Sequence, residues 1–269
     1  SIRRRRGCSK RRPPLLAEAE RVPASRVEDA SRPSPVPAGK HLEALAPISA
    51  GLLFALSATL DTEALLYRPF PDAVEYAYAA LAFRSGESPL LPIGLEAHLS
   101  RFSPLHSLCL AVWSFVAGTA PERLALWNVL AGALLPPLAW VASRRLIGSP
   151  VLRVARCAGV AALAALRQVA GGLMSEPTIA LFLLGGLAAA SRADPAGRRG
   201  VAWAALGGLL MGCAASARVT LAPLPLFAAA AFWRAGGMRS GTAPAMLAGA
   251  FAAWMAHVAY YRLLSGNWM

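Results

Sequence analysis

The sequence predicts an all-α integral membrane protein with about seven transmembrane helices, placed by hydropathy and charge bias. Of its 269 residues, 56% are hydrophobic and only 15% are charged, whereas about 25% of the residues of a soluble domain are charged. The basic residues lie in the N-terminal tail and between apolar runs, as the positive-inside rule expects. The net charge of +13 therefore marks membrane topology. It does not predict a nucleic-acid partner, which would need a continuous basic face with interleaved aromatics.

Residues 1–42 form a basic, proline-rich tail that we expect to be disordered and cytoplasmic. The tail contains RRRR at residues 3–6 and too few apolar residues to bury a core. No small-residue cleavage site follows the next apolar run, so an uncleaved membrane anchor is a better interpretation than a signal peptide. Residues 43–269 are expected to form the transmembrane module, truncated at its C-terminus.

The first crossing is predicted at residues 44–60, at the short end of what spans a bilayer. With the basic tail inside, the polar stretch that follows becomes an outward loop, residues 61–123. Within this loop, the apolar spacing over residues 72–84 predicts a short amphipathic helix on the membrane surface. A second juxtamembrane helix is predicted at residues 104–118, because a crossing there would turn the later arginine clusters outward.

The remaining crossings are placed by hydropathy and by keeping the arginine clusters inside. They are predicted at residues 124–142, 154–172, 177–190, 201–217, 221–233 and 243–261. Several are shorter than about 20 residues, and prolines fall within two of them, which predicts kinked or partly re-entrant helices. These prolines are Pro136, Pro137, Pro223 and Pro225. Gly208 and Gly212 form a GxxxG step, which predicts close helix packing.

No metal or disulfide framework is required by the sequence. The cysteines, at positions 8, 109, 157 and 213, show no CxxC or Cys/His spacing. Asp72, Glu96 and His98 could together hold a divalent cation, but no ligand spacing compels one. Cofactor dependence therefore stays open at this point.

On this topology, charges of both signs gather at the outer face. The residues concerned are Asp72, Glu75, Arg101, His106, Arg167, Glu176, Arg218 and Arg262. An ionisable group at membrane depth costs about 2.5 to 3.5 kcal/mol on insertion scales, so such groups normally face a cavity or a partner. A site that holds an anion with arginine while a carboxylate accepts a proton needs this mixture of groups.

The order of five segments carries a resemblance to a known family. PDAVEY, SRFSPLHSL, RLALWNVLAG, MSEP and SARVT follow one another as in the polytopic, lipid-carrier-dependent glycosyltransferases of the GT-C superfamily, which include the protein mannosyltransferases and the aminoarabinose transferases of lipid A. The resemblance covers residues 44–269. It implies transfer of a sugar from a polyprenyl-phosphate donor to a lipid, glycan or protein acceptor, on the outer face of a bacterial plasma (inner) membrane.

The resemblance also implies roles for individual residues. By position, Asp72 matches the first-loop aspartate, the implied general base, and Tyr76 matches the tyrosine that follows it. Ala73 stands where an adjacent acid is frequent, which argues against the protein mannosyltransferase subgroup. Glu176 in MSEP matches the second acidic position, and Arg218 matches the arginine after the next outward span.

Arg101 lies in a segment that resembles R-[YF]-P-P, with Ser103 in place of the first proline. With Arg218, it is expected to stabilise the departing lipid phosphate. The full set of expected substrate-binding residues is Tyr76, Arg101, His106, Arg167, Glu176 and Arg218.

Simpler interpretations stand beside these roles. Asp72 could cap the helix that follows it, and Glu176 could pair with Arg167 or favour the start of the next span. Arg101 and Arg218 could mark the lipid interface. His106 lies on an apolar stretch, which favours packing over ligation, and the tryptophans suit an aromatic belt. The alternative functions are a non-enzymatic transporter or assembly subunit, and a truncated family member without activity.

Overall fold

A computed structural model describes residues 39–66, 71–93, 96–98, 103–144, 147–163, 172–194, 197–236 and 241–265. All of them belong to one unit, Ala38–Met269. The predicted disorder of residues 1–38 therefore falls outside the described residues, as do predictions for Arg101 and Arg167.

The described part of the chain is mainly α-helical, which confirms the predicted all-α class. Its α-helices are α1 (Gly39–Leu66), α2 (Pro71–Ser85), α3 (Pro104–Ala117), α4 (Pro121–Ser143), α5 (Pro150–Ala162), α7 (Glu176–Arg192), α8 (Arg198–Ala217), α9 (Pro223–Gly236) and α10 (Thr242–Ser265). A 3-10 turn, η1 (Val219–Leu221), links α8 to α9. Two short strands, β1 (Leu91–Ile93) and β2 (Glu96–His98), pair antiparallel between α2 and α3. The sequence analysis did not predict this hairpin.

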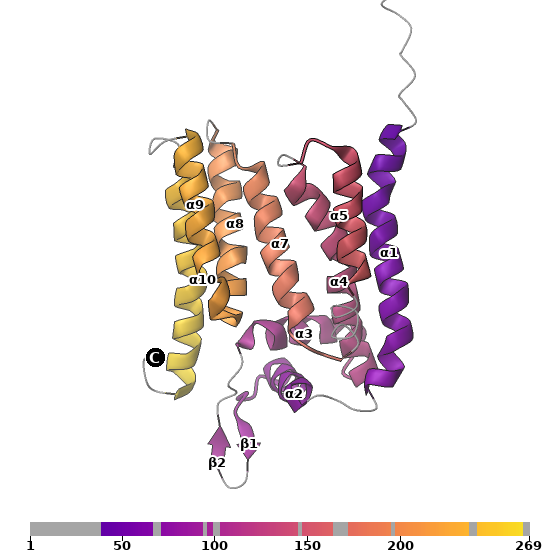
Figure 1. Cartoon of the computed structure of the whole chain (residues 1–269). Helices are drawn as coiled ribbons and strands as arrows, with labels where there is room; N and C mark the ends of the chain where they lie inside the picture. Colours follow the sequence, from indigo (N-terminus) through magenta and orange to yellow (C-terminus); the bar gives the residue numbers. More distant parts are fainter. Residues whose placement is uncertain are drawn as a thin grey trace, which may run out of the picture. The chain divides into compact units, whose positions relative to one another are not determined.

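The helices form one bundle with two helices laid across its end. In Figure 1, α1, α4, α5, α7, α8, α9 and α10 run lengthwise, and α2 and α3 lie crosswise at the lower end, beside the hairpin. Neighbours along the bundle are α1 with α4, α4 with α7, α7 with α8, and α8 with α10. The two helices predicted at residues 72–84 and 104–118 are therefore present, and they differ in direction from the rest. We call the end that carries α2 and α3 the site end, and the opposite end the basic end.

Prolines and serines determine where several helices begin. Ser103 and Ser149 cap α3 and α5 through their hydroxyls, which accept from the backbone of Leu105 and Leu152, and a proline occupies the first turn in both cases. Proline is tolerated there because the N–H that it lacks would have no partner inside the helix. Pro223 and Pro225 likewise fall in the first turn of α9. They begin a helix and do not interrupt one, which corrects their predicted role as breaks in a crossing.

Small residues let α8 and α10 approach closely, as the GxxxG step predicted. A Cβ atom on Gly208 would overlap the carbonyl oxygen of Met246, and one on Gly212 would lie 2.7 Å from the carbonyl oxygen of Ala250. From the other side, a Cβ on Gly249 would overlap the carbonyl oxygen of Ala205. The backbones of the two helices are therefore in direct contact, which only glycine permits.

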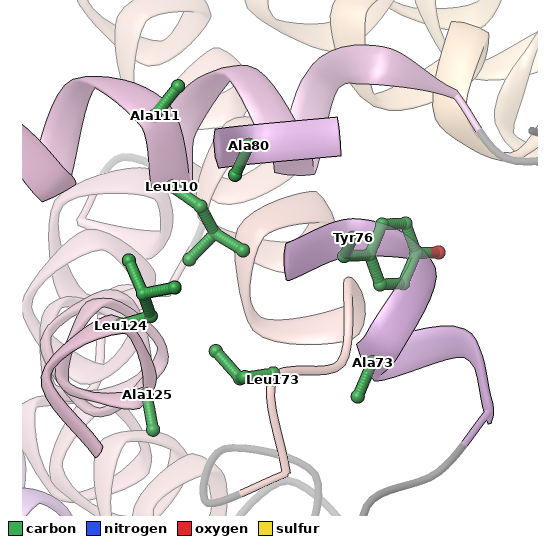
Figure 2. Packing of buried hydrophobic residues seen from close by; sticks show 8 residues of the cluster. All are labelled: Ala73, Tyr76, Ala80, Leu110, Ala111, Leu124, Ala125 and Leu173. Atoms are coloured by element: carbon green, nitrogen blue, oxygen red, sulfur yellow. The ribbon is translucent and has the colours of Figure 1, made fainter. Parts of the chain in front are cut away.

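A buried apolar cluster fixes α2 and α3 against the bundle. Its members are Ala73, Tyr76, Ala80, Leu110, Ala111, Leu124, Ala125 and Leu173. Figure 2 shows the side chains of Leu110, Leu124 and Leu173 pointing toward one another from three different segments. The alanines keep α2 close to α3, and the cluster holds both helices against α4 and the turn before α7.

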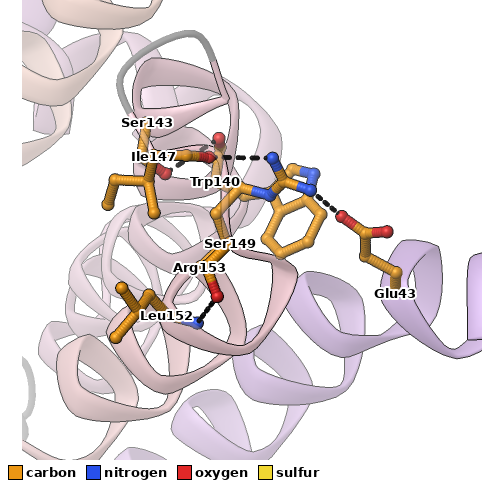
Figure 3. Close-up of polar contacts among 7 residues, drawn as sticks. All are labelled: Glu43, Trp140, Ser143, Ile147, Ser149, Leu152 and Arg153. Atoms are coloured by element: carbon orange, nitrogen blue, oxygen red, sulfur yellow. Dashed lines mark hydrogen bonds and ion pairs between the residues drawn. The ribbon is translucent and has the colours of Figure 1, made fainter.

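At the basic end, a charged contact joins α1 to α5. Arg153 binds Glu43 and donates 2.9 Å to the carbonyl oxygen of Ile147, and its guanidinium stacks 5.1 Å from the ring of Trp140. Figure 3 shows the guanidinium between the Glu43 carboxylate and the Ile147 carbonyl, with the Trp140 ring beside it. The first and fifth helices are thus tied together where the chain turns from α4 into α5.

Three predicted boundaries need correction. Residues 39–42, predicted as disordered tail, are the first residues of α1, and residues 61–66, predicted as loop, are its last. The stretch DTEALL contains good helix formers, so the helix continues after the hydropathy falls. The helix predicted across residues 154–172 runs from Pro150 to Ala162, and residues 164–171 lie outside the described residues.

Of the helices in the described residues, three are long and apolar enough to cross a membrane: Pro121–Ser143, Arg198–Ala217 and Thr242–Leu264. Shorter apolar helical stretches occur at Leu45–Leu60, Pro104–Ala117 and Val219–Arg234. These lengths and compositions point to membrane association.

Candidate functional site

The candidate site is built around the turn at residues 172–175, which leads into α7 at the site end. Within it, Leu173 has a φ angle of 55°, in the left-handed region that leucine rarely adopts. Its side chain is buried in the apolar cluster of Figure 2. A strained backbone conformation of this kind persists only where the surrounding contacts hold it, and such positions cluster at functional sites.

Polar side chains from three helices hold the turn. Each donates to a different residue: Tyr76 Oη of α2 to Ser175 Oγ (3.1 Å), His106 Nε2 of α3 to the Leu173 carbonyl (3.0 Å), and Asn128 Nδ2 of α4 to the Met174 carbonyl (2.8 Å). Three consecutive residues are therefore fixed from three directions. The next residue in the chain is Glu176, so α2, α3 and α4 together determine where its carboxylate lies.

The hydrogen bonds around His106 have one consistent direction. The carbonyl of Leu173 can only accept, so Nε2 carries the proton and Nδ1 accepts from the hydroxyl of Thr178 at 2.8 Å. The same hydroxyl oxygen accepts from the indole of Trp127 at 2.8 Å. The chain of donors thus runs from Trp127 through Thr178 to His106 and ends at the strained turn.

Burial keeps His106 neutral. Its side chain is only 2% exposed, and this burial lowers the pKa of His106 to about 4, against a small opposing effect of the bond to Leu173. The imidazole also packs edge-on against the ring of Tyr76, with 4.8 Å between ring centroids. Both ring nitrogens are occupied within the protein, so His106 supports the turn and presents no free nitrogen to a substrate.

Tyr76 connects this support to the charged part of the site. Burial raises the pKa of the Tyr76 phenol, and the nearby negative charges of Glu176 and Asp72 raise it further, whereas the hydrogen bond to Ser175 and the positive charge of Arg218 lower it. The charges of Asp72, Glu176 and Arg218 all act on this one phenol. These residues come from α2, α7 and the end of α8, and the fold brings them to one place.

Glu176 and Arg218 form an ion pair across the start of α7 and the end of α8. The Arg218 side chain is 53% exposed, whereas that of Glu176 is 28% exposed. Glu176 Oε1 binds the guanidinium, and Oε2 is buried with no hydrogen-bond partner among the described residues. The pair therefore leaves the exposed guanidinium of Arg218 available to an anion, whereas Oε2 of Glu176 is buried.

Asp72 lies in the first turn of α2, half-buried. Because the helix begins at Pro71, Asp72 is inside the helix and does not occupy the N-cap position proposed as its simpler role. A carboxylate in a first helical turn is favoured by the helix dipole.

An apolar groove is lined by residues on both sides of Arg218 in the sequence. A pocket of about 510 Å³ lies among α8, η1, α9 and α10, and its lining includes Ser216, Val219 and Trp254. A second apolar pocket of about 300 Å³ continues along α9 and α10, and the two share Leu226 and Leu247. The two pockets therefore adjoin along α9 and α10, and the second is lined by Trp233 and Pro244 near the basic end.

The structure brings together most of the residues that the sequence singled out. Asp72, Tyr76, His106, Glu176 and Arg218 gather at the site end, although they are distributed over 147 positions of the chain. Arg101 and Arg167 lie outside the described residues. The predicted pairing of Glu176 with Arg167 is thus untested, and Arg218 is the arginine that Glu176 is seen to bind.

Several supporting residues were not found from the sequence. Ser175 and Thr178 flank the predicted Glu176, and nothing in their local pattern sets them apart. Asn128 is 0% exposed, and an asparagine within an apolar helix is the one signal that could have identified it. Trp127, one of the tryptophans expected to suit an aromatic belt, donates to Thr178.

The possible divalent cation finds no site among the residues whose surroundings are described. In that part of the chain, no three His, Cys, Asp or Glu side chains gather as metal ligands do. Glu96 and His98, which we considered with Asp72, lie on strand β2.

Comparison with known proteins adds no assignment. No model of a protein family matches the chain, and no curated protein matches it significantly.

Proposed function

We propose that this protein crosses the plasma membrane about seven times, with its N-terminus in the cytoplasm and the site end outside. Apolar side chains on the flanks of the bundle support this placement. Leu52, Leu56, Phe227 and Phe251 are each at least 60% exposed, and exposed apolar surface on this scale marks contact with a membrane or a partner. The lengthwise helices beyond the three long ones would be tilted or locally shortened crossings.

The distribution of charge supports the orientation. The arginines of the described residues concentrate at the basic end, where α4, α7 and α9 finish and α5 and α8 begin: Arg144, Arg153, Arg156, Arg192, Arg198, Arg199 and Arg234. Carboxylates concentrate at the site end: Asp72, Glu75, Glu87, Glu122 and Glu176. Arginine-rich ends face the cytoplasm in membrane proteins. The site end is then the outer one, and α2 and α3 lie along the outer interface.

We further propose that the protein is a glycosyltransferase that takes a sugar from a polyprenyl-phosphate donor, as the resemblance to GT-C enzymes implies. One observation carries this: Arg218, whose guanidinium is exposed, lies in the chain between Ser216 and Val219, and both of these residues line an apolar groove. A lipid-linked phosphate needs a cation at the interface and an apolar path into the membrane. Arg218 and the groove offer both.

The chemistry follows from the charged groups of the site. The acceptor hydroxyl or amine attacks the anomeric carbon of the sugar, and its proton passes to the Asp72 carboxylate. The bond from that carbon to the phosphate oxygen breaks, and its electron pair remains on the phosphate, where Arg218 stabilises the charge. Glu176 holds Arg218 in place through Oε1. A single displacement of this kind inverts the anomeric centre.

A transporter is a weaker proposal for this bundle. Transport of a charged solute needs ionisable groups along a path through the membrane. In the lengthwise helices, the charged residues of the described part of the chain lie near the two ends. An inactive family member would share this architecture, and only an activity measurement separates it from an enzyme.

The experiment compares two carboxylates on the same helix. Full-length protein in membranes is given radiolabelled polyprenyl-phosphate hexose and pentose donors, and release of polyprenyl phosphate is measured for wild type, Asp72→Asn and Glu75→Gln at matched abundance. Loss of a general base lowers a rate by about 10²- to 10⁴-fold. We therefore expect the transfer rate of Asp72→Asn to fall by about this factor and that of Glu75→Gln to remain near the wild-type rate. Near-normal transfer by Asp72→Asn would remove this residue from the mechanism. Absence of transfer by wild type with every donor would remove the proposed function.

A further inference from the structure

A polar pocket lies at the basic end of the bundle, away from the candidate site. Its volume is about 440 Å³, and it is lined by Trp140, Val141, Arg144, Ser191 and Arg192. The first three come from the end of α4 and the last two from the end of α7. The hydroxyl of Ser191 crosses between the helices, at 3.4 Å from the carbonyl oxygen of Val141. The pocket is therefore formed where the two helices finish side by side, and its volume is within the usual range of ligand sites.

The charge of this pocket is not balanced from within. Its lining contains two arginines and no carboxylate, and neither arginine forms an ion pair with another described residue. The neighbouring Arg153 shows the contrast, because its guanidinium binds Glu43 beside the ring of Trp140 (Figure 3). Arg144 and Arg192 thus keep their charge available, whereas Arg153 is neutralised by a partner.

The surroundings of Arg192 hold its guanidinium in place and leave the edge of the group open. Arg192 stacks 5.2 Å from the ring of Trp203 on α8. Stacking uses the flat face of the guanidinium and leaves its N–H groups free to bind an anion in the plane. With Arg144, Arg192 gives the pocket two guanidinium groups from separate helices, and arginine binds phosphate oxygens through paired, charge-assisted hydrogen bonds.

We infer that this pocket binds the phosphate of an anionic phospholipid headgroup from the inner leaflet. The inference uses the proposed membrane placement and is independent of the transfer reaction. On that placement the basic end lies at the cytoplasmic interface, where anionic lipids concentrate and where basic pockets between helices bind their headgroups. Val141 and the Trp140 ring supply apolar surface beside the two charges. This surface can contact the glycerol portion of a lipid, whereas a free phosphate ion has no apolar part to place against it.

A purely structural role for the two arginines is the competing explanation. Both lie at the ends of helices, where a positive side chain stabilises the exposed carbonyls through the helix dipole. That role predicts a loss of stability in any lipid, without selectivity for a headgroup. The two explanations therefore predict different results in a lipid-binding experiment, because only the phosphate site predicts selectivity for an anionic headgroup.

The test is native mass spectrometry of the detergent-solubilised full chain, titrated with phosphatidylglycerol or with phosphatidylcholine. Wild type is compared with Arg144→Gln plus Arg192→Gln, and with Arg156→Gln plus Arg199→Gln as a control that removes the same charge from the same end outside the pocket. Charge-assisted hydrogen bonds of this type are worth about tenfold or more in affinity. We expect the pocket variant to lose at least about that factor for the first phosphatidylglycerol, with the control and phosphatidylcholine binding little changed.

Three results would overturn the inference. The first is an equal loss of affinity in both double variants, which would indicate diffuse surface charge, and the second is equal affinity of wild type for the two lipids. The third is displacement of phosphatidylglycerol by millimolar inorganic phosphate, which would make the ligand a soluble ion. The single variant Arg144→Gln guards against misfolding, because this side chain is exposed. It is expected to lose part of the affinity and to retain the thermal stability of wild type in phosphatidylcholine. Unchanged affinity in this folded single variant would also count against the pocket.

Discussion

The phenol of Tyr76 donates a 3.1 Å hydrogen bond to the hydroxyl of Ser175, across 99 positions of the sequence. This bond joins the helix that carries Asp72 to the turn that precedes Glu176. It is one of three bonds that hold a turn with a left-handed leucine, so the geometry of the site depends on side chains that need not touch a substrate. The predictions below test that dependence and the placement of the bundle.

Tyr76→Phe is expected to loosen the turn. The substitution keeps the ring and its contact with His106, and it removes the hydroxyl that reaches Ser175. A hydrogen bond of this kind contributes about 1 kcal/mol to stability, so the midpoint of thermal unfolding in detergent should fall. Tyr78→Phe is the matched control, because Tyr78 is exposed on the same helix. Equal midpoints for the two variants would show that the bond does not support the turn.

The stability of the protein is expected to fall between pH 6.5 and pH 4 because of His106. Its pKa is lowered from 6.5 to about 4, so in this window the unfolded chain binds a proton that the folded protein excludes. The contribution is fully present above pH 6.5 and is lost as the pH falls to about 4. It amounts to about 3 kcal/mol, at about 1.4 kcal/mol for each pH unit between the two pKa values.

The measurement is the unfolding midpoint against pH for wild type and for His106→Gln. Glutamine does not titrate, so the variant is expected to be less stable at pH 7 and to lose most of the slope between pH 6.5 and pH 4. A slope as steep in the variant as in wild type would assign the pH dependence to other groups.

Gly208→Ala is expected to separate α8 from α10. The added methyl group would overlap the carbonyl oxygen of Met246, and overpacking of this kind costs about 1 to 3 kcal/mol. Gly159→Ala on α5 has no atom within 4 Å of the added carbon, so this control should be neutral or stabilising through helix propensity. Unfolding midpoints in detergent decide the matter, and a neutral Gly208→Ala would mean that the helices lie farther apart.

Single cysteines at Ser88 and Ser149 are expected to react with an impermeant reagent from opposite sides of the membrane, in a background without the natural cysteines. Both serines are exposed, Ser88 between α2 and the hairpin and Ser149 before α5. Reporter fusions after Gly118 and after Ile147 provide a second test, because α4 lies between these points. The reporter after Gly118 is expected outside the membrane, and the reporter after Ile147 is expected inside. Labelling of both serines from one side would contradict the proposed topology.

Much of the architecture could be predicted because it depends on local properties. Hydropathy located the apolar helices, and the positions of arginine predicted that residues 104–118 form a separate helix with a different direction from the bundle. The GxxxG step at Gly208 predicted close packing, and the structure identifies α10 as the partner. Boundaries were less accurate. The end of α1 lies at Leu66 and not at Leu60, because hydropathy reports burial in the membrane whereas helix length follows backbone propensity.

The sequence by itself determined the helical class, the separation of arginines from carboxylates along the chain, and the identity of the residues able to carry charge at the site. Only the tertiary structure decided which of them meet. Arg218 pairs with Glu176 across 42 positions, and the Thr178 hydroxyl reaches His106 across 72. The physical reason is that hydropathy and helix propensity act within a few turns of one helix. A hydrogen bond between helices depends on their rotation and tilt, which the packing of alanines and glycines sets across the whole bundle.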